Sequence, residues 1–170
     1  MGGNDRCKRG CMSDQNKTYT LTPNEYAELL PKRPKDAHKG TFGSCLIIAG
    51  SSLYMGAAIL ASKAALRSGV GLVHLIGPDS WTAQIVSQFP EIIYHEVKMP
   101  NECFDTSHCE PVQLIIDKYP IRALAIGPGL GRSDKTRAFL NQLLPIFETV
   151  PNGMVIDADA LYLIPLSELM

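Results

Sequence analysis

The stretch HKGTFGSCLIIAGSSLYMGAA (residues 38–58) places one short apolar run between two glycine-rich turns. Residues 45–49 carry no charge, as is typical of a strand that is buried on both faces. The alanine-rich segment 56–69 has the composition of a helix, and its closing Gly69 suits the position just after a helix C-terminus. Because no glycine-lysine-serine run is present, the turn is not a standard phosphate-binding loop. The stretch therefore predicts a strand, a tight turn and a helix.

The same alternation continues to the end of the chain. Apolar runs predict strands at 44–50, 71–77, 91–97, 121–127 and 153–158, and helices are expected at 56–69, 80–89, 111–117 and 133–144. We expect Asp79 to cap the helix at 80–89, and residues 98–109 to form an irregular loop. Strands that are apolar throughout and alternate with helices predict an α/β fold with a mostly parallel sheet, covered on both faces.

The N-terminal region predicts little structure. Residues 1–17 are polar and lack periodicity, so we expect a disordered tail, with the domain running from 18 to 170. Within the domain, Thr22 suits a helix N-cap, Pro23 the first helical position and Glu25 the third, which together make a capping box. Pro31 is expected to end this short helix.

Composition excludes several classes of function. The formal net charge is −1, so no charge excess favours nucleic acid or an anionic membrane surface. Residues 41–62 are uncharged, but glycine and serine divide them into a strand and a helix, which argues against a membrane span. The five cysteines show no disulfide framework, and Cys45 lies in an apolar run, so a reduced, cytoplasmic protein is expected.

The histidines and remaining cysteines give weaker signals. Cys103, His108 and Cys109 could together hold a metal ion, although reduced thiols are the simpler interpretation. His74 and His95 lie in predicted strands, where a hydrogen-bonded structural role is expected. No spacing predicts a metal cage or a nucleophilic triad. No metal site is therefore assigned.

Glycine- and aspartate-rich segments follow three of the predicted strands. They are AGSSLYMGAA at 49–58, GPGLGRS at 127–133 and DADA at 157–160. In a parallel sheet these segments meet at one edge, where ligands bind, and glycine there lets the backbone approach a phosphate-bearing ligand. Each segment has a structural alternative: a tight strand–helix turn for the glycines, and a helix N-cap for Asp159. Three together predict a binding site.

Four motifs, DAHKGTFG, LIIAGSSLYMGAAILASKAALRSGVGLVHL, AIGPGLGRS and VIDADAL, give the sequence a specific resemblance. In order and spacing they resemble the NAD(P)H-hydrate dehydratase family from about Leu21 onward. The resemblance implies a ribokinase-like three-layer sandwich. It also implies a metabolite-repair lyase that uses ADP or ATP, with Mg²⁺, to phosphorylate the hydroxyl of hydrated NADH or NADPH. Loss of the phosphate then restores NAD(P)H.

The resemblance also implies site residues and partners. Gly56, Ala57, Gly127, Gly129, Gly131 and Asp157 would lie near the hydrated dinucleotide, and Lys39 and Asp159 near the nucleotide phosphates. Asp157 could act through magnesium. Family members often form symmetric oligomers, so a homo-oligomer that binds the small molecules NADHX or NADPHX is expected, with no nucleic acid and no membrane as partner.

The sequence departs from the family after VIDADAL. The family continues with a histidine-bearing loop, a lysine-glycine strand and a glycine-threonine-glycine-aspartate loop whose aspartate is the base. None of these is among the 170 residues, so we expect a truncated domain without activity of its own and a catalytic base beyond Met170. Alternatives are a non-catalytic nucleotide-binding or assembly subunit and another ribokinase-like small-molecule kinase. A dehydrogenase fits least, because no strand precedes a full glycine fingerprint.

Overall fold

A computed structural model describes residues 20–30, 34–147, 149–151 and 153–165. The predicted tail at 1–17 lies outside these residues, as do Cys7 and Cys11. The chain divides into one unit up to Asp36 and a larger unit from Ala37 onward. No helix in the described part of the chain is long and apolar enough to cross a bilayer.

The first unit contains one helix, α1 (Pro23–Leu29). Thr22 is its N-cap, and the Thr22 hydroxyl accepts a hydrogen bond from the backbone N–H of Glu25. The Glu25 carboxylate in turn accepts from the backbone N–H of Thr22 at 2.8 Å. The hydrogen bond from the Thr22 N–H, and a second one from the Thr22 hydroxyl to the carboxylate at 2.7 Å, lower the pKa of Glu25. The predicted capping box is therefore confirmed.

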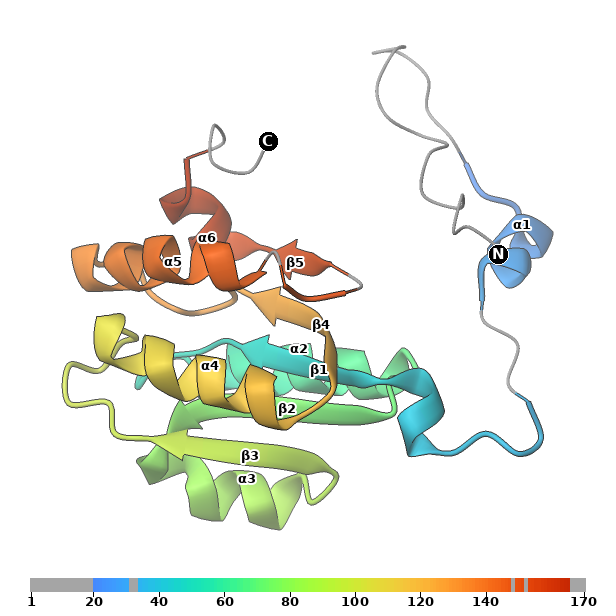
Figure 1. Cartoon of the computed structure of the whole chain (residues 1–170), viewed down its shortest axis with the longest axis horizontal. Helices are drawn as coiled ribbons and strands as arrows, with labels where there is room; N and C mark the ends of the chain where they lie inside the picture. Colours follow the sequence, from blue (N-terminus) through green and yellow to red (C-terminus); the bar gives the residue numbers. More distant parts are fainter. Residues whose placement is uncertain (1–19, 31–33, 148, 152, 166–170) are drawn as a thin grey trace. The chain divides into compact units, whose positions relative to one another are not determined.

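The second unit is built on one parallel sheet (Figure 1). Its five strands are β1 (Ser44–Ile48), β2 (Leu72–Pro78), β3 (Ile92–Val97), β4 (Ile121–Ile126) and β5 (Met154–Ile156), in the order β3-β2-β1-β4-β5. Every neighbouring pair is parallel. The α/β class and the predicted strand positions are confirmed. Because the order reverses at β1, the loops after β1 and β4 lie next to each other.

The crossover helices lie on both faces of this sheet (Figure 1). They are α2 (Met55–Arg67), α3 (Thr82–Gln88), α4 (Cys109–Lys118) and α5 (Asp134–Phe147), followed by α6 (Ala158–Leu163). Gly69 follows the C-cap of α2 with φ 93°, as predicted for a glycine after a helix end. Short 3-10 turns η2 (Lys39–Phe42), η3 (Asp79–Trp81) and η4 (Thr106–His108) complete the unit.

Two boundary predictions need correction. The helix expected at 80–89 is divided into η3 and α3, and the N-cap of α3 is Trp81, without a side-chain capping bond. Asp79 instead opens η3 and does not cap α3. The loop expected at 98–109 contains η4, which Asp105 caps by accepting from the Ser107 N–H. An aspartate three residues before a histidine was an available capping signal here.

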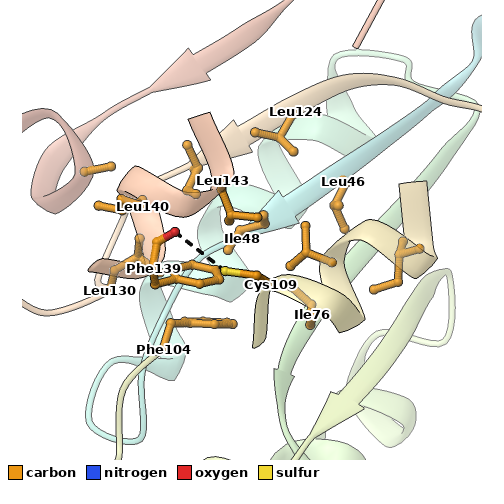
Figure 2. Packing of buried hydrophobic residues seen from close by; sticks show 14 of the residues in the cluster. Leu46, Ile48, Ile76, Phe104, Cys109, Leu124, Leu130, Phe139, Leu140 and Leu143 are labelled. Carbon is orange, nitrogen blue, oxygen red and sulfur yellow. Dashed lines mark hydrogen bonds between the residues drawn. The ribbon is translucent and has the colours of Figure 1, made fainter. Parts of the chain in front are cut away.

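The face under α4 and α5 holds the larger core. Alternate strand residues contribute to it, for example Leu46 and Ile48 from β1 and Leu124 from β4. Figure 2 shows Phe139 of α5 against Phe104. The centroids of the two rings are 5.0 Å apart. The Cys109 thiol donates to the Phe139 carbonyl oxygen at 3.8 Å. Helices α4 and α5 are thereby joined above the strands.

The opposite face carries a second core beneath α2 and α3. Residues of the other parity point to it, including Cys45 and Ile47 from β1 and Leu75 from β2. The buried Trp81 and Ile85 cover them. Cys45 is a core residue as predicted, and burial raises the pKa of its thiol to about 11, which keeps it protonated.

Candidate functional site

Backbone hydrogen bonds tie together the loops that follow β1, β4 and β5. The Gly50 N–H donates to the Pro128 carbonyl at 2.7 Å, and the Gly127 N–H donates to Ile48 at 3.2 Å. The Asp157 N–H donates to Ile126 at 3.0 Å. The structure therefore brings the three predicted segments to one edge of the sheet, as expected from parallel pairing.

Two glycines in the loop after β4 are required by close packing. Gly127 has φ 131°, and a Cβ there would overlap the carbonyl oxygen of Asp157. Gly129 has φ 69°, and a Cβ there would lie 2.8 Å from the Ala57 Cβ and 2.9 Å from the Tyr54 Cβ. Both positions thus need glycine because of this chain's own neighbours. The alternative of a tight strand–helix turn accounts for them without a ligand.

Gly131 is different from these two glycines. It has φ 82°, but a Cβ at this position would meet nothing within 4 Å. The backbone N–H of Gly131 donates to the Asp159 carboxylate at 3.0 Å. The space beside Gly131 is therefore open, which is a property of a ligand cavity.

Asp159 lies in the first turn of α6 and is not its N-cap. The cap is Asp157, which has extended backbone angles and no side-chain capping bond. The Asp159 carboxylate accepts from the Gly131 N–H with one oxygen and from Arg132 Nε, at 2.7 Å, with the other. The N-cap interpretation of Asp159 is therefore wrong, because its side chain turns toward the loop after β4.

Arg132 was not predicted from the sequence as a site residue. Its guanidinium forms the ion pair with Asp159 and lies 4.2 Å from the centroid of the Tyr162 ring. Tyr162 follows Asp159 by three residues and shares its face of α6. A signal was present, since Arg132 directly follows the glycine segment, but its orientation depends on α6, which comes much later in the chain.

These residues surround a cavity of about 410 Å³, lined by Tyr54, Gly129, Gly131, Arg132 and Asp159. Its volume lies in the usual range of small-molecule sites. It contains backbone from two glycines, one charged pair and one exposed aromatic ring. Such a cavity can hold an anionic ligand that carries a ring.

A larger cavity of about 630 Å³ runs along α2 on its β4 side. Its lining includes six alanines of α2 and β4, together with Val155 of β5 and Asp157 just after it. Ala57 lines this cavity and also contacts the Gly129 region. Asp157 is exposed here, while Gly56 is exposed with open space around its Cα.

Lys39 does not join the other predicted residues. It opens η2, just before the amino end of β1, and its carbonyl oxygen lies against Gly71 at the start of β2. The three loops lie at the carboxyl end of the same strands. The sheet therefore separates Lys39 from the other residues within one chain.

The described residues contain no cluster of three side chains able to hold a metal ion. Cys103 and Cys109 are free thiols with separate contacts, to Ser133 Oγ and to Phe139 respectively. His108 is buried and accepts from the Asp105 N–H, while its Nε2 lies 3.0 Å from the Lys98 carbonyl oxygen. This trio is thus engaged in local structure and does not converge on one point.

His74 and His95 form a contact away from the site. His74 Nδ1 lies 2.9 Å from His95 Nε2, and the ring of Tyr119 packs against both. Burial, with a smaller contribution from His95, lowers the pKa of His74 to about 4. Burial, followed by Lys118, also lowers the pKa of His95. The predicted structural role of these histidines is confirmed.

Comparison with known sequences identifies relatives. The sequence profile of the NAD(P)H-hydrate dehydratase family matches residues 45–168. The bifunctional NAD(P)H-hydrate repair enzyme Nnr of Dictyoglomus turgidum is 39% identical over 127 residues, which are 75% of this chain and 24% of that protein. The ATP-dependent (S)-NAD(P)H-hydrate dehydratase of Aedes aegypti is 34% identical over 80% of this chain and 39% of its own.

Solved structures share the fold. A ribokinase-like protein from Enterococcus faecalis superposes with a TM-score of 0.69 over 88% of this chain and 50% of its own, at 23% identity. The ADP/ATP-dependent NAD(P)H-hydrate dehydratase of Bacillus subtilis, co-crystallised with ATP/Mg²⁺, gives 0.60 at 30% identity over 82% of this chain and 46% of its own. The predicted ribokinase-like fold is confirmed. The chain spans half or less of each relative.

Proposed function

The chain belongs to the NAD(P)H-hydrate dehydratase family, and we propose that it forms the part of such a repair enzyme that binds hydrated NADH or NADPH. The observation that carries the proposal is the meeting of three loops, after β1, β4 and β5, around a cavity of about 410 Å³. A dinucleotide offers both a ring and phosphates to such a cavity. Ligands of parallel α/β sheets bind at this edge.

The proposed reaction is an ADP- or ATP-dependent dehydration. The nucleotide would phosphorylate the hydroxyl of the hydrate, and loss of that phosphate would restore the dihydronicotinamide ring. Asp157, exposed at the end of β5, is the proposed contact for Mg²⁺, which usually takes one or two carboxylates and completes its shell with phosphates and water. Asp159 is less suited to this role, because Gly131 and Arg132 already occupy its oxygens.

The loop residues have separate proposed roles. Gly131 leaves room for the ligand, whereas Gly127 and Gly129 fix the loop against Asp157 and Tyr54. Ala57 would contact the dinucleotide from the first turn of α2. Lys39 would act on phosphate only in a neighbouring copy, since it lies at the other end of the strands. The free thiols fit a reducing compartment, and we place the protein in the cytoplasm.

The test is a titration of the purified chain with NADPH hydrate, in which calorimetry measures the affinity. We expect saturable binding that is tighter than that of NADPH itself, because the site is proposed to accept the added hydroxyl. Ala57→Leu should weaken the binding of NADPH hydrate about tenfold, because the larger side chain fills the space where Ala57 is proposed to contact the dinucleotide. The matched control is Ala83→Leu in α3, where the residue is exposed and lines neither cavity. Absence of binding by the wild-type chain would refute the proposal.

Turnover is measured separately. NADPH recovery at 340 nm with ADP or ATP and Mg²⁺ distinguishes a working enzyme from a chain that only binds. Since the motifs expected to supply the base are not among these residues, we expect binding without turnover. Turnover by the chain alone would show that a different residue acts as the base.

A further inference from the structure

Arg132 is a charged residue in the candidate site to which neither the motifs nor the comparisons give a role. It lies at the wall of the 410 Å³ cavity, directly after the glycine segment. Its side chain is 55% exposed, yet it has two fixed contacts. An exposed arginine side chain usually samples many rotamers, whereas these two contacts hold the Arg132 side chain in one of them.

The two contacts act on different parts of the guanidinium. The Asp159 carboxylate, only 16% exposed, accepts a hydrogen bond from Nε at 2.7 Å. The Tyr162 ring lies beneath the guanidinium plane, with its centroid 4.2 Å from the central carbon. The ion pair and the ring together fix both the direction and the plane of the group.

The terminal amino groups of Arg132 remain available for a ligand. Within the described residues, Nε is the Arg132 donor with a hydrogen bond, and neither terminal nitrogen has one. These two nitrogens form the end of the fork that binds phosphate through two parallel hydrogen bonds. A lysine ammonium cannot form these two parallel hydrogen bonds. An arginine at this position is therefore suited to bind a phosphate through both terminal nitrogens.

The charge on Asp159 does not cancel this preference. Its two oxygens accept from Gly131 N–H and from Arg132 Nε, so they are occupied on the inner side of the pair. Arg132 is the more exposed partner and is the one that a ligand entering the cavity meets. Asp159 is therefore a positioning residue for Arg132.

We infer that Arg132, oriented by Asp159 and Tyr162, is the anion-contacting residue of this site and binds a phosphate group of the ligand. The inference rests on the proposed function for the identity of the ligand. Two sources of phosphate are chemically equivalent here, the pyrophosphate of the hydrated dinucleotide and that of the ADP or ATP donor. The Arg132 fork would recognise either.

The experiment follows the Arg132 Nε–Hε signal by ¹H–¹⁵N NMR in the 170-residue chain. The titrants are NADPH hydrate, ADP, inorganic pyrophosphate and the phosphate-free hydrate of dihydronicotinamide riboside. We expect pyrophosphate and one of the two nucleotides to shift the signal, and the phosphate-free compound to leave it in place. The nucleotide that shifts it at lower concentration identifies the source of the phosphate.

Variants add affinities to this assay. Arg132→Gln should weaken binding of that nucleotide about tenfold, or about 1.4 kcal/mol. Arg132→Lys keeps the charge but loses the two parallel donors, so it should restore part of the affinity that Arg132→Gln loses. Asp159→Asn should weaken binding about threefold, because Arg132 loses its charged partner. The matched control is Arg67→Gln in the last turn of α2, at the other end of the strands, with no expected change.

The outcomes separate the two proposals. If the wild-type chain binds NADPH hydrate and Arg132→Gln binds it equally well, with an unshifted Arg132 signal, the inference is overturned while the proposed function stands. If pyrophosphate and ADP shift the signal but NADPH hydrate does not bind, the anion site stands and the proposed substrate fails. If no phosphate compound shifts the signal, the inference fails whatever the variants do.

Discussion

The two faces of the sheet differ in how far they are covered. On the face under α4 and α5, strand β4 contributes Leu124 and Ile126, both fully packed. On the opposite face the same strand contributes Ala123 and Ala125, which line the 630 Å³ cavity beside α2. Adjacent residues of one strand thus meet a dense core on one side and an open groove on the other.

The difference teaches that small side chains leave a groove between α2 and β4, whereas β1 and β2 on the same face lie under the core of α2 and α3. Val155 of β5 is 63% exposed and Leu60 of α2 is 71% exposed at this groove. Among the strands of the described residues, β5 is also an edge strand, paired with β4 alone. Exposed apolar groups at this edge add little to stability, so on the α2 side of β4 and β5 burial stabilises less than it does under α4 and α5.

The strongest test of this comparison is a large-to-small change on each face. Phe139→Ala should lower the free energy of unfolding by about 3–5 kcal/mol, because Phe139 is fully buried against Phe104. Leu60→Ala, on the open face, should change it by less than about 0.5 kcal/mol. Urea unfolding followed by circular dichroism measures both, and equal losses would show that the faces are equally packed.

A glycine pair tests the junction of β4 and β5. Gly127→Ala should cost about 3 kcal/mol, because the new methyl overlaps the Asp157 carbonyl and the β5 end must move. Gly131→Ala has the strain of a positive φ but open space, and should cost about 1 kcal/mol. The measurement is thermal unfolding of the two variants in parallel. A smaller loss of stability for Gly127→Ala than for Gly131→Ala would mean that the backbone at Asp157 can shift at little cost in free energy.

The packed face carries one acid-sensitive contact. The His74–His95 hydrogen bond needs a lone pair on one ring, and His95, Lys118 and Tyr119 offer His74 no negative charge. The folded pKa of His74, about 4, lies below the ordinary histidine value of 6.5. Its contribution is therefore present above pH 6.5 and is lost as the pH falls toward 4.

We expect about 2 kcal/mol of this stability to be lost between pH 7 and pH 5. The measurement is the difference in unfolding free energy between wild type and His74→Leu at each pH, so that carboxylate titrations cancel. A difference that does not change with pH would contradict the assigned pKa direction of His74. Any loss of stability in acid would then come from the titration of other groups.

The smallest expected effect is on the open face itself. Ala125→Val adds two methyl groups at the wall of the groove and suits a strand, so the unfolding free energy should change by about 0.5 kcal/mol or less. The overpacking control is the same enlargement at Ala58, a fully buried residue of α2, where a loss of about 1–3 kcal/mol is expected. A large loss at Ala125 would show that the groove is filled.

Most of the fold could be predicted because local patterns decide it. The uncharged run at Cys45, the glycine after α2 and the capping box at Thr22 each act over a few residues, and each is confirmed. The prediction for Asp79 failed for the opposite reason. Several residues near it compete to start the helix, and the packing of Trp81 in the core decides between them.

The site could be predicted only as far as its loops. That 49–58, 127–133 and 157–160 meet at one edge follows from parallel pairing, which the alternating pattern already implies. The sequence alone also determined the α/β class, the family resemblance and the buried cysteine. Which residues face one another did not follow, since Lys39 and Arg132 are both basic and both adjoin a glycine.

Only the tertiary structure placed Arg132 on Tyr162, turned Asp159 away from its helix end, and left Lys39 at the far end of the strands. The physical reason is distance along the chain. Helix periodicity and turn chemistry act between neighbours, whereas these contacts join residues about 30 positions apart once β5 pairs with β4. Strand pairing determined which charges meet, and the local sequence determined that the strands exist.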